Sequence, residues 1–271
     1  MTDPKRILFI AQEIAPYTPE SNISLTCRYL PQAIQERGKE IRTFMPRFGI
    51  INERRNQLHE VIRLSGMNLI IDESDHPLII KVASIQSARM QIYFIDNDDF
   101  FNRKAALFDE TTNKHFPDND ERAIFFARGV LETVKKLRWS PDIIHCHGWF
   151  SSFAPLFVKY VLNENPLFEN TKLVISLYDD EFKTLLDKQL YVKLLKEGVP
   201  KSALENIKNK PSYTNILKAA IKVSNAVIAG VENPSEELVN FTVENNIPFL
   251  EYQNEDTFVD KFNELYNFLL Y

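Results

Sequence analysis

Continuous runs of apolar residues alternate with helical patterns over most of the chain. The run 6–11 (RILFIA) precedes a helical stretch over about 21–37 that closes at Gly38, and the run 40–45 (EIRTFM) stops at Pro46. Strands that are apolar on both sides are typical of a parallel sheet covered by helices on both faces. The first fifty residues therefore predict the start of a parallel α/β sheet.

The middle of the chain has a different pattern. Residues 60–65, 68–72, 78–85 and 89–96 form short strand-like runs separated by turn residues. Such spacing predicts hairpins or a meander.

The α/β alternation then returns and continues to the last residue. Strands are predicted over 142–145, 173–177, 225–229 and 248–252, and helices over 120–137 and 150–163, over a broken segment 180–224, and after the N-cap-like sequence 233–235. The last helix carries one apolar face, made of Phe258, Phe262, Leu265, Tyr266, Leu269 and Leu270. We expect residues 1–271 to form a single α/β domain with a doubly wound, mostly parallel Rossmann-like sheet and a β-hairpin or meander insertion.

Composition narrows the classes of function. The net charge of -5 gives no electrostatic reason to expect nucleic acid as a partner. The first apolar run is too short for a signal peptide or a membrane span, so we expect a cytoplasmic protein with no membrane partner. Cys27 and Cys146 are predicted to be reduced and buried, and no metal site is expected. Seven glycines among 271 residues, against an average of about 7 %, leave few places for a phosphate-binding loop.

Six segments in the same order carry a resemblance to one enzyme family. They are RILFIAQEIAPYT, YLPQAIQERGKEIRTFMPRFGII, IDNDDFFNR, DNDERAIFFARGVLE, SPDIIHCHGWFSSFAPLFVK and ILKAAIKVSNAVIAGV. Together they resemble the N-terminal half of bacterial glycogen synthases and plant starch synthases, which are GT-B glycosyltransferases that extend α-1,4-glucans from ADP-glucose. The resemblance implies half of a GT-B fold and a role in glucan metabolism. It also implies that the C-terminal nucleotide-binding domain of such enzymes is absent from this chain.

The loop after the first strand departs from the family pattern. The family has Lys-Thr-Gly-Gly-Leu there, whose lysine and backbone amides hold the phosphates of the donor. This chain has Thr18, Pro19, Glu20 and Ser21. The carboxylate of Glu20 would repel a diphosphate, and Pro19 lacks a backbone N–H. We therefore interpret this loop as a lost phosphate site and expect no cofactor.

The positions that the resemblance marks as catalytic are also changed. Gly148 stands in place of an aspartate in the family's His-x-His-Asp-Trp-His, and Phe150 replaces its last histidine. Tyr178 stands where the family has a histidine that contacts the transferred sugar. No catalytic residue is therefore predicted. A metal triad of His145, Cys146 and His147 is disfavoured, because the cysteine faces the opposite side of the strand.

Ligand-binding candidates remain where the predicted strands end, since α/β sheets bind ligands at the carboxyl ends of their strands. Trp149 and Phe150 could stack on a sugar or pack in the core, and the loop 96–103, with Phe100 and Phe101, could line the same cleft. The run 179–181 could bind a divalent cation, although carboxylates that open a helix more often stabilise its dipole. The candidates are Tyr17, Asp96, His145, His147, Trp149 and Asp179.

Two hypotheses from different classes follow. The first is a pseudoenzyme, which acts in glucan metabolism by binding an α-glucan or oligosaccharide, or by docking on a full-length synthase or another protein. The alternative is an ADP-glucose glycosyltransferase that needs a second chain for its nucleotide domain.

Overall fold

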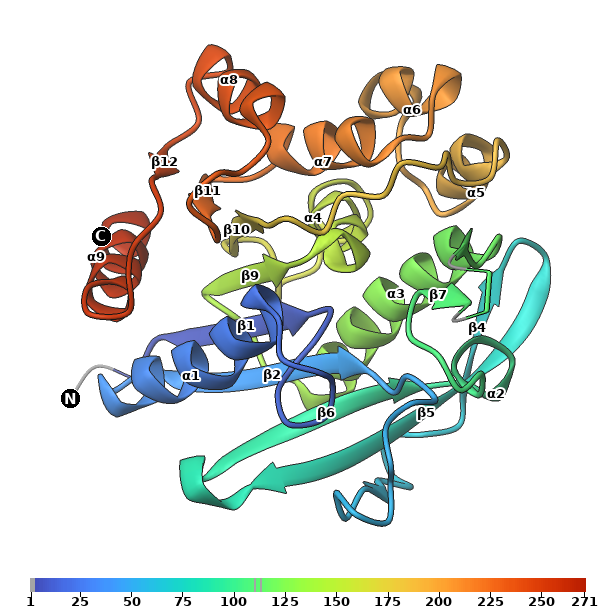
Figure 1. Ribbon diagram of the computed structural model, residues 1–271, viewed down its shortest axis with the longest axis horizontal. Coiled ribbons are helices and arrows are strands. Elements are labelled where there is room, and N and C mark those ends of the chain that lie inside the picture. Colours follow the sequence, from blue (N-terminus) through green and yellow to red (C-terminus); the bar gives the residue numbers. More distant parts are fainter. Residues whose placement is uncertain (1–2, 110, 113) are drawn as a thin grey trace.

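The computed structural model describes residues 3–109, 111–112 and 114–271. Its main feature is a 10-stranded sheet in the order β12-β11-β10-β9-β1-β2-β6-β5-β3, in which β4 pairs with β5 outside this path (Figure 1). Neighbouring strands from β12 to β6 run parallel, whereas β5 runs antiparallel to β6, β3 and β4. The strands are β1 (Arg6–Ala11), β2 (Glu40–Pro46), β3 (His59–Glu60), β4 (Met67–Ile71), β5 (Ser74–Ile85), β6 (Met90–Asp96), β9 (Ile143–His147), β10 (Lys172–Leu177), β11 (Ala226–Ala229) and β12 (Phe249–Leu250). The predicted parallel sheet and its hairpin insertion are confirmed.

Helices cover both faces of this sheet. The helices are α1 (Asn22–Glu36), α2 (Asp98–Phe101), α3 (Asn119–Leu137), α4 (Phe153–Tyr160), α5 (Leu190–Lys196), α6 (Glu205–Asn209), α7 (Tyr213–Lys222), α8 (Glu236–Glu244) and α9 (Phe258–Leu270). A small ribbon of β7 (Phe108–Asp109) and β8 (Lys114–His115) lies apart from the sheet. Among the residues that the structure describes, no helix is both long enough and apolar enough to cross a membrane.

The two faces of β1 show why the strands are continuous apolar runs. Ile7 and Phe9 point to a cluster that contains side chains of α1 and α9, while Leu8 and Ile10 point to the larger cluster that contains side chains of α3, α4 and α7. Successive residues of a strand face opposite ways, so a sheet with helices on both sides needs apolar residues at every position. In Figure 1, α9 lies beside α1, which brings the last helix back to the first strand.

Three predicted elements differ from the observed ones. The strand predicted over 60–65 is only β3, because the chain turns from Val61, whose backbone oxygen accepts from the N–H groups of Leu64 and Ser65. The helix predicted from 150 begins as a 3-10 turn, Trp149–Ser151, before α4. Residues 180–189 are not helical and α5 begins at Leu190, so the prediction that carboxylates 179–181 open a helix is wrong.

Candidate functional site

The carboxyl ends of four neighbouring strands bring five residues together. Gln12 follows β1, His147 ends β9, Gly148 follows it, Tyr178 follows β10, and Gly230 follows β11. Ala11 is in register with His147, and Leu177 is in register with Ala229. We call these five residues the strand-end site. It includes Gly148 and Tyr178, two of the positions where the sequence departs from the residues that the resemblance marks as catalytic.

The side chain of Gln12 fills the space beside Gly148. A Cβ atom added to Gly148 would lie 2.8 Å from the Gln12 Cβ and 2.9 Å from its Oε1. The same Oε1 accepts a hydrogen bond of 3.1 Å from the backbone N–H of Phe150. Gly148 also has a φ of 81°, a conformation that other L-residues adopt only at a cost. No side chain, and therefore no carboxylate, fits at residue 148 unless the surrounding residues move.

The ring of Tyr178 occupies the adjacent part of the strand-end site. Its side chain is buried, and its hydroxyl lies 2.8 Å from His147 Nδ1. A Cβ atom added to Gly230 would come within 2.4 Å of Tyr178 Cε1, so the missing side chain of Gly230 makes room for the ring. Burial raises the pKa of Tyr178 well above its ordinary value. Tyr178 is therefore neutral, positioned and unable to act as an acid or base near neutral pH.

His145 and His147 form a buried pair on one side of β9, with their ring planes tilted by 41°. Their ring centroids lie 3.8 Å apart. His145 is hydrogen-bonded through Nδ1 to the Tyr266 hydroxyl at 2.7 Å and through Nε2 to the Ser176 hydroxyl at 2.8 Å, which ties α9 to the sheet. Cys146 faces the other cluster, as the alternation of the strand predicts. His145 is thus a structural residue with both ring nitrogens bonded.

The free energy of unfolding should fall at acid pH, because these histidines are neutral in the folded protein and protonated in the unfolded chain. Burial holds the pKa of His147 at about 3, and burial followed by the neighbouring His147 keeps that of His145 well below its ordinary value. Between about pH 6 and pH 4 the unfolded chain binds a proton at residue 147 that the folded chain does not bind, so stability is lost as the pH falls. Each such group contributes a slope of about 1.4 kcal/mol per pH unit.

The measurement is urea unfolding of the wild type and of His147→Asn from pH 7 to pH 4. The variant removes this one titration and leaves the other groups in place. We expect the free energy of unfolding of the wild type, minus that of the variant, to fall by about 1.4 kcal/mol per pH unit between pH 6 and pH 4. A difference that does not change with pH would contradict the buried, neutral state of His147.

Asp180, which the sequence indicated only as part of the possible cation-binding run 179–181, adjoins the strand-end site through a bond to the residue after Gly148. Its Oδ2 accepts from the backbone N–H of Trp149 at 2.7 Å, and its Oδ1 accepts from the Tyr213 hydroxyl at 2.8 Å. Burial raises its pKa to about 6, against the opposing effect of these two donors. The indole of Trp149 is itself buried and packs against Phe150 and Phe182. Trp149 therefore belongs to the core and offers no open face for stacking on a sugar.

The segment at the position of the family's phosphate-binding loop contains a carboxylate, that of Glu13, bonded to the residue that caps α1. Ser21 caps α1, its Oγ accepts from the N–H of Ser24 at 3.0 Å, and the same Oγ donates to Glu13 Oε2 at 2.6 Å. Thr18 is buried, whereas Pro19 and Glu20 are exposed. Two carboxylates, those of Glu13 and Glu20, thus belong to the segment that enters α1. The start of α1, which would otherwise attract an anion, has a carboxylate of the protein beside its cap.

The other predicted candidates do not join the strand-end site. Tyr17 packs edge-on against Phe94 at 4.9 Å in the core, and burial raises its pKa to about 12. Asp96 is fully buried and pairs with Arg47 and Lys81, each at 2.9 Å. Neither side chain is free to bind a ligand.

Asp179 is the exposed member of the predicted set. Its two carboxylate oxygens accept from Asn22 Nδ2, each at 3.3 Å. Phe100 and Phe101, from the loop that was expected to line a cleft, are buried. Of the candidates at this edge, Asp179 alone is open to solvent.

A cluster of carboxylates near α5 surrounds a lysine. Asp120, Glu121 and Asp187 bring ligand atoms within 4.8 Å of one another. The Lys193 ammonium lies among them, 2.8 Å from Asp120, 2.6 Å from Glu121 and 3.0 Å from Asp187. The positive charge that these carboxylates need is supplied by the chain itself.

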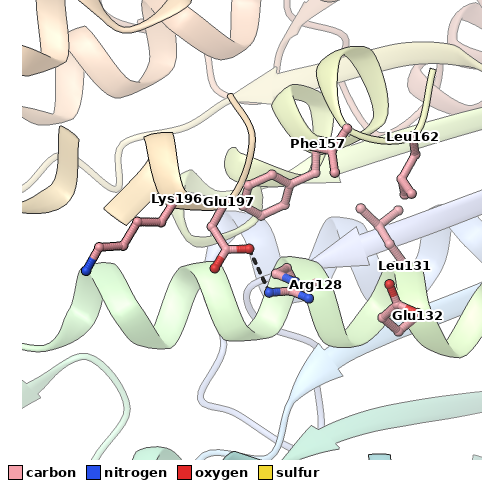
Figure 2. Close-up of a pocket in the computed structure, with 8 residues that line it drawn as sticks. Arg128, Leu131, Glu132, Phe157, Leu162, Lys196 and Glu197 are labelled. Atoms are coloured by element: carbon pink, nitrogen blue, oxygen red, sulfur yellow. Dashed lines mark hydrogen bonds and ion pairs between the residues drawn. The ribbon is translucent and has the colours of Figure 1, made fainter. Parts of the chain in front are cut away.

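A hollow of about 210 Å³ lies between α3, α4 and α5 (Figure 2). Figure 2 shows the ion pair of Arg128 and Glu197, 2.7 Å long, beside the apolar side chains of Leu131, Phe157 and Leu162. None of the predicted site residues lines this hollow. It lies between helices and not where the strands end, so it is separate from the strand-end site.

The sequence was compared with known families and proteins, and the matches agree with this fold. The family described as starch synthase catalytic domain matches residues 6–247. A glycogen synthase of Chlorobium luteolum is 36 % identical over 194 residues, which are 72 % of this chain and 40 % of that protein. A glycogen synthase of Chlorobium phaeovibrioides is 30 % identical over 233 residues, 86 % of this chain and 47 % of that protein.

The fold also matches the catalytic domain of starch synthase IV from Arabidopsis thaliana, which was solved bound to ADP and acarbose. The TM-score is 0.73 at 17 % identity, and the match covers 94 % of this chain and 53 % of that one. The chain belongs to the starch synthase catalytic domain family, as its six sequence segments predicted. It spans less than half the length of the glycogen synthases that it matches.

Three residues that shape the site were missed in the sequence, and Asp180 was considered only as part of the run 179–181. Gln12 directly follows β1, and Gly230 directly follows β11, so their positions at strand ends were available as a signal. Asp180 stands next to the candidate Asp179. Tyr266 lies 121 residues from His145, and no local pattern indicates their contact.

Proposed function

We propose that this chain is a non-catalytic glycogen-synthase-like protein of glucan metabolism, which acts by binding an α-glucan or a partner protein and not by transferring glucose. The observation that carries the proposal is the Tyr178 ring across the strand ends, held by His147 and accommodated by Gly230. The family's sugar-contacting histidine is replaced by a group that fills the space.

Two further features support loss of transfer. The position of the family's aspartate is a glycine whose missing side chain is replaced in space by Gln12. The loop at the phosphate position contains Pro19 and Glu20, and Glu13 lies beside the cap of α1. A nucleotide diphosphate would meet carboxylates where it needs donors and cations.

A transfer assay tests the proposal. The purified chain is incubated with radiolabelled ADP-glucose or UDP-glucose and glycogen, alone and with the separately produced nucleotide domain of the Chlorobium luteolum glycogen synthase. We expect incorporation equal to that of a heat-killed sample in every arm, while the full-length relative serves as the positive control. Incorporation only when the nucleotide domain is added would support the transferase that needs a second chain, and incorporation by the chain alone would overturn both readings.

Binding is measured separately from transfer. Isothermal titration with ADP should give no heat, because the phosphate loop lacks the lysine and both glycines of the family. Retention on immobilised glycogen, eluted by soluble maltooligosaccharide, is the result expected for glucan binding. Passage through the column without retention would leave partner docking as the mode of action.

A further inference from the structure

A second cavity lies at the opposite edge of the sheet, where the parallel strands begin. Its volume is about 220 Å³. It opens between the end of α1, the start of β2, and the turn from β5 into β6. Its polar lining comes from Gln35, Glu40, Arg42, Arg89, Gln91 and Tyr93. This cavity shares no residue with the strand-end site.

Arg42 lies in the cavity, and no carboxylate of the described residues pairs with it. Its Nη1 donates to the Tyr93 hydroxyl at 2.9 Å, and its guanidinium lies 5.8 Å from the ring centre of Tyr93 and 5.1 Å from that of Trp139. Its Nε is buried and bonds to no atom of the described chain. The two rings and the Tyr93 hydroxyl fix the position of the guanidinium group, and no carboxylate of the lining bonds to it.

Arg89 supplies a second positive charge from the turn before β6. It is exposed, and within the described part of the chain its side chain makes no ion pair or hydrogen bond. Its backbone has a φ of 50°, which is uncommon for a residue other than glycine, asparagine or aspartate. Arg89 ends the 3-10 turn Gln86–Ala88 between β5 and β6, and this turn places the residue in the lining of the cavity.

Among the described residues that line the cavity, Glu40 is the only one with a carboxylate, and both of its oxygens already accept hydrogen bonds. Glu40 accepts from Trp139 Nε1 at 2.6 Å through Oε1 and from Arg6 Nε at 3.1 Å through Oε2. Its charge is therefore balanced by Arg6, and Arg42 and Arg89 leave the cavity with a net positive charge.

We propose that this cavity binds the phosphate group of a small metabolite. Two guanidinium groups provide the charge and the forked donors that phosphate oxygens require. The amides of Gln35 and Gln91 lie in the same lining and can bond to a polar body attached to the phosphate. The proposal is independent of glucose transfer and of the strand-end site.

The test is titration of the intact protein with inorganic phosphate and with glycerol 3-phosphate, followed by two-dimensional amide NMR, with glycerol as the uncharged control. We expect saturable shifts at the amides of residues 89–91, with glycerol 3-phosphate binding more tightly than phosphate if the ligand is an ester. Equal affinities for the two would assign the site to free phosphate. Arg89→Gln should weaken binding by about tenfold or more, the effect of losing one charged hydrogen-bonding partner, and Arg89→Lys should weaken it less.

Arg138→Gln is the matched control variant. Arg138 is also exposed and has a φ of 51°, but it does not line the cavity. Its substitution should leave the affinity unchanged. Absence of saturable shifts in the wild type, or an equal loss of affinity in Arg89→Gln and Arg138→Gln, would overturn the proposal.

Discussion

Replacing Lys193 by Met should lower the free energy of unfolding by about 3 to 5 kcal/mol. The Lys193 ammonium is almost fully buried and contacts three carboxylates, of which that of Asp120 is fully buried. Without the ammonium, the carboxylate of Asp120 would remain in the interior with no positive charge beside it, which is costly. Urea unfolding at pH 7 measures the loss.

Lys196→Met is the matched control for this prediction. Lys196 lies one helical turn further along α5 and contacts Asp72 at 2.9 Å and Glu73 at 2.7 Å, but its side chain is exposed to water. Exposed pairs of this kind contribute little, so the control should unfold like the wild type. A loss below about 1 kcal/mol in Lys193→Met would show that the three carboxylates do not depend on the lysine.

Restoring the family's aspartate by Gly148→Asp should destabilise the fold by about 2 to 4 kcal/mol and should not create activity. The positive φ of residue 148 and the close approach of Gln12 both oppose a side chain. Gly38→Ala is the control for a side chain at positive φ without a steric neighbour, since Gly38 has a φ of 83° and a Cβ there would meet no atom within 4 Å. Its cost is a lower bound for residue 148, whose φ of 81° and ψ of 153° lie outside the left-handed helical region. The free energy of unfolding of Gly38→Ala should fall by about 1 to 2 kcal/mol, the cost of a side chain at a positive φ.

A double-variant cycle isolates the contribution of Gln12. We expect Gly148→Ala to cost less free energy of unfolding in a Gln12→Ala background than in the wild type, because the cost of the backbone conformation at residue 148 remains and the contact with Gln12 is relieved. Equal costs of Gly148→Ala in both backgrounds would contradict the conclusion that Gln12 fills the missing side chain's place. The same unfolding titrations give all the values needed.

The two changed positions of the strand-end site, Gly148 and Tyr178, depend on neighbouring residues. Gly148 and Tyr178 are not isolated substitutions, because Gln12 fills the space beside one and Gly230 makes room for the other. An aspartate restored at residue 148 alone would clash with Gln12, and a histidine restored at residue 178 alone would leave the space beside Gly230 unfilled. This coupling is the physical reason to expect that Tyr178→His or Gly148→Asp alone will not recover transfer.

The sequence by itself determined the parallel sheet, most of its strands and helices in their order along the chain, and the family. Those features depend on local properties: strands buried on both faces are apolar at every position, and the apolar face of α9 repeats at spacings of three and four. The sequence also located the departures at Thr18 to Ser21, Gly148 and Tyr178, because motif positions are read along the chain.

Only the tertiary structure decided which contacts the residues at those positions make. Whether Tyr178 leaves a cleft open or fills it depends on Gly230 and His147, which lie on neighbouring strands. Burial converted Asp96, His145 and Trp149 from ligand-binding candidates into structural residues, through contacts with Arg47, Tyr266 and Phe182. Such contacts join residues tens of positions apart, and their geometry is set by the packing of whole elements and not by any pattern in the neighbouring sequence.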